Sequence, residues 1–170
     1  MRLTPPRWSR SLPTGLVVGC ATLGPLGRKL PAPGTWGSLA GLLYFALFFS
    51  RATLGENLLA SALGAYLAVA LCGEAEARLR EKDPGKVVLD EFIVMPLCFL
   101  GWRDLSGHLP YGAVLLAGFA LFRFFDIVKP LGIGRLQRLP GGWGVVGDDV
   151  GAALAACAVL HGGAWLWVKF

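Results

Sequence analysis

The stretch YGAVLLAGFALFRFFDIVKP, residues 111–130, decides the fold class because it is almost entirely apolar and ends in a short charged pattern. A helix rises about 1.5 Å per residue and a bilayer's hydrocarbon core is about 30 Å thick, so a spanning helix needs roughly 20 apolar residues. Residues 111–128 approach that length, and Pro130 discourages continuation of the helix. The stretch therefore predicts a membrane-spanning helix.

The rest of the chain repeats this apolar character. It is 55% hydrophobic and 16% charged, with a mean hydropathy of +0.59, which is too apolar for an ordinary soluble domain. Four further apolar segments are visible, at about 36–50, 55–73, 87–101 and 149–168. They lack the alternation of barrel strands, and several are short for a straight span. We therefore expect one all-α domain over residues 1–170, a polytopic membrane bundle of about five transmembrane or partly inserted helices.

The basic residues orient this bundle. The N-terminus and the loops near 74–86 and 129–148 carry twelve Lys and Arg residues, whereas the other side carries Arg51, Arg103 and Lys169. This positive-inside bias predicts a cytoplasmic N-terminus and a C-terminus on the far side. The formal charge is +5, but no basic tract interleaved with aromatic residues is present. We therefore expect membrane lipids or a phosphorylated ligand as partners, and no nucleic acid.

The first polar motif is LPAPGTWGSLAG, residues 30–41. Its prolines favour an extended entry, after which Thr35 or Ser38 can cap a helix whose first turn binds a phosphate. Alternatively, its glycines simply allow close helix packing in a membrane. The motif alone supports both interpretations equally.

Two pairs of adjacent carboxylates form the second signal. Asp90 and Glu91 lie near the predicted cytoplasmic start of the third apolar segment. Adjacent helical residues are about 100° apart around the axis, so we expect one to face the bundle centre and the other the loops. Asp148 and Asp149 follow the glycine-rich run 141–147, which predicts a turn at the start of the last segment.

The third signal is the charged end of the opening stretch. Arg123, Asp126 and Lys129 are three residues apart, which places plus, minus and plus on one helical face. They could form an internal ion pair that makes Arg123 tolerable in lipid. Ionisable residues inside spans are costly enough that a functional role is the default hypothesis.

The predicted topology places all these motifs at one membrane face. Five carboxylates would repel one another there unless cations neutralise them, and Mg²⁺ prefers such oxygen ligands. Beside them Arg123, Lys129 and Lys29 could bind a phosphate, an arrangement suited to phosphoryl chemistry. Both histidines, His108 and His161, map near the opposite face, so a phosphohistidine mechanism is not expected.

In their order and spacing, residues 31–41, 82–92, 122–130 and 141–150 resemble the bacterial phosphatidylglycerophosphatase A family. The resemblance implies an all-helical, multi-pass enzyme of the bacterial inner membrane whose active site faces the cytoplasm. It would hydrolyse the terminal phosphomonoester of phosphatidylglycerophosphate, with Mg²⁺, to phosphatidylglycerol. By position the family's acidic and lysine motif residues fall on Asp90, Glu91, Asp126, Lys129, Asp148 and Asp149. Glu76 and Asp83 match further acidic positions, and Val94 departs from a glycine found in many members.

Within that set we expect Asp90, Asp126 and Asp149 to be Mg²⁺ ligands, and Glu91 or Asp148 to be a ligand or the general base. A second class of function is a membrane protein that binds or transports divalent cations. A transport path should continue toward the far side, whereas these acids stop at one face. The sequence leaves the oligomeric state open.

Overall fold

The computed structural model describes residues 6–107 and 110–169, and every regular element within these residues is helical. The elements are η1 (Trp8–Ser11), α1 (Thr14–Ala21), α2 (Pro25–Lys29), α3 (Pro33–Tyr44), η2 (Phe45–Phe49), α4 (Leu54–Leu79), α5 (Leu89–Val94), η3 (Met95–Phe99), α6 (Trp102–Ser106), α7 (Tyr111–Val128), η4 (Ile133–Arg138) and α8 (Gly142–Lys169). The all-α expectation is therefore confirmed.

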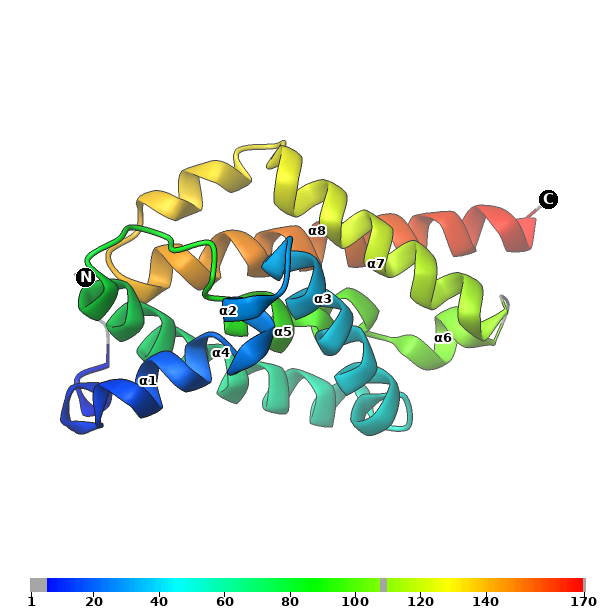
Figure 1. Ribbon diagram of the computed structural model, residues 1–170. Coiled ribbons are helices and arrows are strands. Elements are labelled where there is room, and N and C mark those ends of the chain that lie inside the picture. Colours follow the sequence, from blue (N-terminus) through cyan, green and yellow to red (C-terminus); the bar gives the residue numbers. More distant parts are fainter. Residues whose placement is uncertain (1–5, 108–109, 170) are drawn as a thin grey trace.

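The chain runs back and forth between the two ends of an elongated molecule (Figure 1). It does so along α3 with η2, then α4, then α5 with η3, then α7 and finally α8. The described N-terminal residues lie at one end with η4 and the loop that follows α4. The turn after η2, α6 and the end of α8 lie at the other.

Three of the described helices are long and apolar enough to cross a membrane, namely α4, α7 and α8. With 26, 18 and 28 residues they measure about 39, 27 and 42 Å. The continuous helix Pro33–Phe49 is apolar but shorter. Segment 87–101 differs from the expected span, because it divides into the six-residue α5 and the 3₁₀ helix η3. Pro96 lies in η3, and Gly101 adopts a left-handed conformation (φ 69°) that ends the segment.

Helix starts and crossings follow from local sequence. A capping box begins α4, because Thr53 Oγ1 accepts from the backbone N–H of Glu56 while Glu56 Oε2 accepts from that of Thr53. Helices α4 and α8 cross closely at Gly142, where an added Cβ would lie 1.8 Å from the Val69 carbonyl oxygen. Small residues permit such approaches in membrane bundles.

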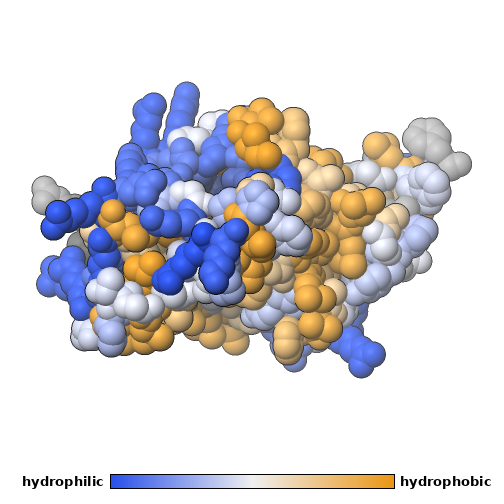
Figure 2. All heavy atoms as spheres, in the orientation of Figure 1, coloured by the Kyte–Doolittle hydropathy of each residue, from blue (hydrophilic) through white to orange (hydrophobic). Residues whose placement is uncertain are grey.

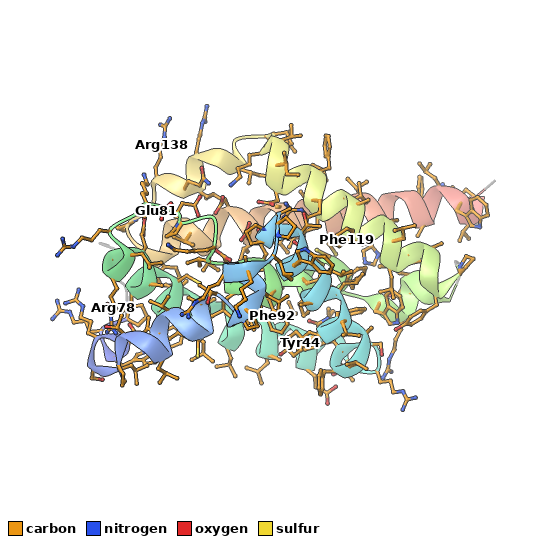
Figure 3. All side chains as sticks on the ribbon, viewed as in Figure 1. Tyr44, Arg78, Glu81, Phe92, Phe119 and Arg138 are labelled. Carbon is orange, nitrogen blue, oxygen red and sulfur yellow. The ribbon has the colours of Figure 1, made fainter. Side chains whose placement is uncertain are left out.

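Polar and apolar side chains separate along the long axis of the molecule. In Figure 3 the labelled Arg78, Glu81 and Arg138 lie toward the N-terminal end. Tyr44 and Phe92 stack in the apolar part, with ring centroids 4.8 Å apart. Figure 2 shows the same division on the surface, with hydrophilic residues gathered toward the N-terminal end and apolar residues beside them over α3 and α7. The charged motifs belong to the starts of α3, α5 and α8 and to the end of α7, which lie between these two parts in Figure 1.

Candidate active site

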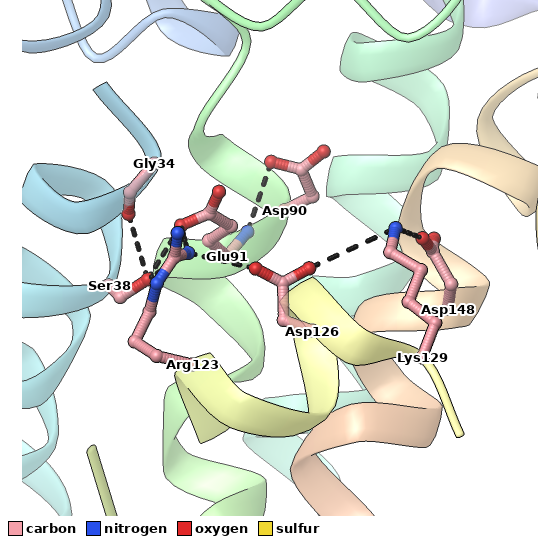
Figure 4. Close-up of polar contacts among 8 residues, drawn as sticks. All are labelled: Gly34, Ser38, Asp90, Glu91, Arg123, Asp126, Lys129 and Asp148. Atoms are coloured by element: carbon pink, nitrogen blue, oxygen red, sulfur yellow. Dashed lines mark hydrogen bonds and ion pairs between the residues drawn. The ribbon is translucent and has the colours of Figure 1, made fainter. Parts of the chain in front are cut away.

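The predicted site residues come from four helices that meet at this boundary (Figure 4). Ser38 lies in the second turn of α3, and Asp90 and Glu91 in the first turn of α5. The last turns of α7 carry Arg123 and Asp126. Lys129 follows α7 directly, and Asp148 and Asp149 lie in the second turn of α8.

Arg123 is the centre of the first polar contact group. Its Nη1 donates to Glu91 Oε2 and Asp126 Oδ2, both at 2.8 Å, and to Ser38 Oγ at 3.2 Å. Ser38 Oγ also lies 2.6 Å from Glu91 Oε2, to which it donates. These side chains are mostly buried, so water screens the charges weakly. Three elements distant in sequence are thus joined through one guanidinium group.

Lys129 is the centre of the second group. Its Nζ donates to Asp148 Oδ2 and lies 3.9 Å from Asp126 Oδ1. Lys129 has a left-handed backbone conformation (φ 48°) at the end of α7, which turns its side chain toward α8. Asp126 therefore connects the two groups, and the polar contacts run continuously from Ser38 to Asp148. The predicted i, i+3 pairing of Arg123, Asp126 and Lys129 is confirmed.

The remaining carboxylates are more deeply buried. Asp90, Asp148 and Asp149 are 5%, 3% and 4% exposed. Asp148 Oδ1 is buried and has no hydrogen-bond partner among the described residues. Asp149 lies near enough to Asp90 and Asp126 for their charges to act on it. The structure thus brings all five predicted carboxylates into one region, where they outnumber the basic side chains.

Burial perturbs the ionisable groups outside the spanning helices. Desolvation raises the pKa of Asp90 well above its ordinary value, and the neighbouring charge of Glu91 acts in the same direction. Burial also raises the pKa of Glu91, although Ser38 and Arg123 oppose the rise. Burial lowers the pKa of Lys129, but the hydrogen bond to Asp148 and the surrounding carboxylates outweigh it, so the net shift is upward. A surplus of negative charge in a dry site accounts for all three directions.

The glycines of the first motif hold α3 against α5. A Cβ added at Gly34, Gly37 or Gly41 would lie 2.2 Å from Glu91 Oε1, 2.8 Å from Val88 Cβ or 2.6 Å from the Phe92 carbonyl oxygen, respectively. The packing interpretation of these glycines is therefore confirmed. Gly34 has a further effect, because its missing side chain leaves the space that Glu91 Oε1 occupies against the start of α3.

Two predictions for this motif are wrong in their local geometry. Helix α3 starts at Pro33 with Ala32 in the N-cap position, so neither Thr35 nor Ser38 caps it. Proline suits the first helical turn because its missing N–H would have no intrahelical acceptor there. Instead, Ser38 Oγ donates to Glu91 Oε2 at 2.6 Å and also lies 2.8 Å from the Gly34 carbonyl oxygen. Thr35 and Lys29 are exposed and make no side-chain hydrogen bond or ion pair with any described residue.

Two further expectations need correction. Residues 142–147 form the first turns of α8 rather than a glycine turn, and within 141–147 only Gly141 has a positive φ. Glycine is favoured in these turns because they approach Val69 and the η4 segment closely. One of Asp90 and Glu91 was expected to face the loops, but both are mostly buried: Glu91 points to Arg123, and Asp90 points away from it beside the buried Cys72 thiol. The position of Cys72 beside Asp90 could not be predicted, because a lone cysteine in an apolar run carries no sequence signal for such a contact.

A pocket of about 270 Å³ lies beside the site, lined by Glu76, Asp83, Gln137 and the start of α8. Asp83 Oδ2 accepts from Gln137 Nε2 at 3.1 Å, and its charge acts on both Asp90 and Asp148. Gln137 has no motif around it that would have indicated this contact. At the opposite end, His161 Nε2 lies 2.7 Å from the Leu100 carbonyl oxygen, so it is far from the carboxylates as predicted. His108 lies outside the described residues.

The carboxylates have the oxygen donors that Mg²⁺ prefers, and the unpaired Asp148 Oδ1 is compatible with a cation ligand. As the side chains stand, no three His, Cys, Asp or Glu residues of the described chain are arranged to hold one metal ion together. Asp126 and Asp148 are paired with basic groups instead. The carboxylate oxygens are therefore suitable donors for Mg²⁺, whereas in this structure Asp126 and Asp148 form ion pairs with basic side chains.

Three helices long and apolar enough to cross a membrane, together with buried acids, a guanidinium and an ammonium group that meet in one region, define the class of protein: a helical membrane-type protein with a buried charged site. Comparison of sequences narrows this class. The profile of the family "Phosphatidylglycerophosphatase A" matches residues 19–164. The chain belongs to the phosphatidylglycerophosphatase A family, which is a family of phosphatases.

Individual relatives agree with this assignment. The chain is 39% identical over 131 residues to the phosphatidylglycerophosphatase A of Haemophilus influenzae, covering 76% of this chain and 77% of that protein. It is 33% identical over 135 residues to the Escherichia coli protein of the same name, covering 76% and 72%. A putative phosphatidylinositol-3-phosphatase of Bacteroides thetaiotaomicron is 34% identical over 139 residues, covering 79% and 85%. No solved structure matches the chain.

Proposed function

We propose that this protein hydrolyses the terminal phosphomonoester of phosphatidylglycerophosphate to phosphatidylglycerol and phosphate, with Mg²⁺, on the cytoplasmic side of the bacterial inner membrane. The observation that carries the proposal is the continuous polar network from Ser38 to Asp148 in a chain of this family. Two of the three relatives carry the corresponding name. The helix ends that carry the residues of this network, at the starts of α3, α5 and α8 and the end of α7, adjoin the apolar part of the molecule, which suits a lipid whose chains stay in the bilayer.

The basic groups and Ser38 would bind the phosphate. Arg123 offers a planar set of N–H donors, and Lys129 adds a second positive charge on the same side of α7. Both are already held by Asp126, which would keep them oriented as negative charge develops on the phosphoryl oxygens. Asp126 thus acts as a positioning residue in this proposal rather than as a metal ligand.

Asp90, Asp148 and Asp149 would hold the cation. Asp90 and Asp149 form no ion pair with a described basic side chain, and Asp148 keeps one oxygen unpaired. Bound Mg²⁺ would polarise phosphoryl oxygens and lower the pKa of water. Glu91 is the best candidate for the general base, because Arg123 and Ser38 hold its Oε2 while its Oε1, packed against Gly34, forms no hydrogen bond with a described residue.

The alternative of a cation transporter gains no support from the sequence of the spans. Beyond the cluster, the rest of α7 and α8 carries no acidic residue toward the far end. An ion path would need ligands along that route.

The test is phosphate release from phosphatidylglycerophosphate in detergent micelles, with Mg²⁺ or with excess chelator. We expect chelation to abolish turnover and Asp149→Asn to lower kcat by about a hundredfold or more. Asp104→Asn, in the exposed part of α6, is the matched control and should keep full activity. Phosphatidylinositol 3-phosphate serves as a competing substrate. Full activity of Asp149→Asn, or full activity in chelator, would overturn the mechanism.

A further inference from the structure

An apolar groove lies between α2, α3 and α7. It has a volume of about 430 Å³, and its lining includes Leu26 of α2, Trp36, Ala40 and Leu43 of α3, Ala46 of η2 and Leu115 of α7. No charged residue lines it. Figure 2 shows apolar side chains gathered over this part of the molecule. It is a shallow, open groove whose lining side chains Trp36 and Leu43 are themselves exposed, and its volume falls in the range of small-ligand sites.

One end of the groove adjoins the charged site. Trp36 and Ala40 flank Ser38 along α3, and Ser38 turns inward to Glu91 and Arg123. Helices α3 and α7 are therefore in contact at this level, and the groove runs from there toward Ala46. A molecule in the groove would reach the polar network without leaving the surface of the protein.

The length of the groove matches one leaflet of a bilayer. Trp36 and Ala46 are ten residues apart, which corresponds to about 15 Å of helix. That is half of the roughly 30 Å hydrocarbon core. A chain that starts at the level of Trp36 would thus end near the bilayer midplane, as an acyl chain does.

The charges at the groove's polar end complement a phospholipid. Arg28 and Lys29 end α2, two and three residues after the lining residue Leu26, and both are exposed. Arg123 lies on the other side, in the site. A phosphate ester between an acyl chain and a second phosphate would meet positive charge on both sides. This gives Lys29 a place beside the lipid backbone, outside the polar network.

We propose that this groove holds one acyl chain of the lipid substrate and so presents the headgroup phosphate to Arg123, an inference that rests on the proposed function. Lipid tails are already in hydrocarbon, so the groove gains little hydrophobic free energy by binding one. Its effect is to orient the substrate, because a fixed chain limits where the headgroup can lie. Errors of about 1 Å in such positioning lower rates by as much as a hundredfold.

The test fills the groove with Ala40→Trp and compares two substrates, dioleoyl phosphatidylglycerophosphate and its deacylated headgroup. We expect kcat/KM for the diacyl lipid to fall tenfold or more, and kcat/KM for the deacylated compound to stay unchanged. Ala62→Trp, at an exposed position of α4 outside the groove, is the matched control and should change neither value. Equal loss on both substrates, or no loss on the lipid, would overturn the proposal.

A second measurement does not depend on turnover. Phosphatidic acid with a diazirine in one acyl chain is photocrosslinked to the wild-type protein, and the labelled peptides are mapped by mass spectrometry. We expect labels within 26–46 and near Leu115, and their loss in Ala40→Trp. Labels spread evenly over α4 and α8 would overturn the proposal that the groove holds an acyl chain. Groove labelling by a protein that cannot hydrolyse phosphatidylglycerophosphate would overturn the proposed function alone.

Discussion

At the scale of single residues, Arg123 has the strongest claim to hold the site together, because one nitrogen contacts Ser38, Glu91 and Asp126. Arg123→Met would leave two carboxylates in a mostly buried site without this partner. Removing one member of a buried pair typically costs about 3–5 kcal/mol. We expect the free energy of unfolding, measured by detergent titration in mixed micelles, to fall by an amount near the lower end of that range.

A double-mutant cycle separates the ion pair from other effects of Arg123. Glu91→Gln combined with Arg123→Met should be less destabilised than the two single changes predict, with a coupling energy of about 1–3 kcal/mol. The control is Arg138→Met, at an exposed arginine of η4, which should change stability by less than about 0.5 kcal/mol. Additive single effects would show that Arg123 and Glu91 do not interact in the folded protein.

Residue types and spacing were enough to predict which side chains gather, but not how they pair. The i, i+3 positions of Arg123 and Asp126 fix their contact within one helix. The contact of Arg123 with Glu91 depends instead on how α5 and α7 pack against each other, and the sequence of neither helix alone determines that packing. The inward direction of Glu91 could not be predicted for the same reason.

At the scale of elements, the contact between α3 and α5 depends on glycine. A Cβ at Gly41 would lie 2.6 Å from the Phe92 carbonyl oxygen and 3.0 Å from its Cα, and this backbone cannot move aside as a side chain can. We expect Gly41→Ala to lower the free energy of unfolding by about 1–3 kcal/mol.

The matched control is Gly112→Ala in α7, where an added Cβ meets nothing within 4 Å. Alanine favours a helix over glycine by about 0.5–1 kcal/mol, so this variant should be neutral or slightly more stable. Thermal unfolding of both variants in the same detergent makes the comparison. Equal Tm values for Gly41→Ala and the wild type would contradict the close packing of α3 on α5.

Long helices were predicted better than short ones. Hydropathy located α7 and the start of α4, because length and composition alone define a span, although α4 continues six residues beyond its expected end at residue 73. Segment 87–101 has the same composition but is interrupted at Pro96 and packed inside the protein. Apolar composition does not distinguish a lipid-facing helix from a buried segment, so its conformation could not be predicted from the sequence.

At the scale of the whole molecule, the ends differ in charge. Arg78 and Arg138 lie toward the end that holds the described N-terminal residues, and Arg103 and Lys169 belong to α6 and the end of α8 at the other. Counting basic residues predicted this separation because each loop joins consecutive passes. It also supports our proposal that the end with η4 faces the cytoplasm.

Labelling of intact cells with a membrane-impermeant maleimide tests this orientation. Cys20 is the exposed native cysteine, so Cys20→Ser provides the background. In that background Asp104→Cys should react in intact cells, whereas Arg138→Cys should react only after lysis. The reverse pattern would invert the orientation and place the carboxylate cluster on the outer side.

The short, interrupted conformation of α5 and η3 has a consequence for biogenesis. This segment is a poor candidate for independent insertion, because α5 has six residues and η3 five, far fewer than the roughly 20 that a spanning helix needs, and Asp90 and Glu91 add two acidic groups at its start. The long helices α4, α7 and α8 need no such help. We therefore expect α5 and η3 to insert into the bilayer only together with the other helices of the bundle. The active site would then form late, after the bundle is complete.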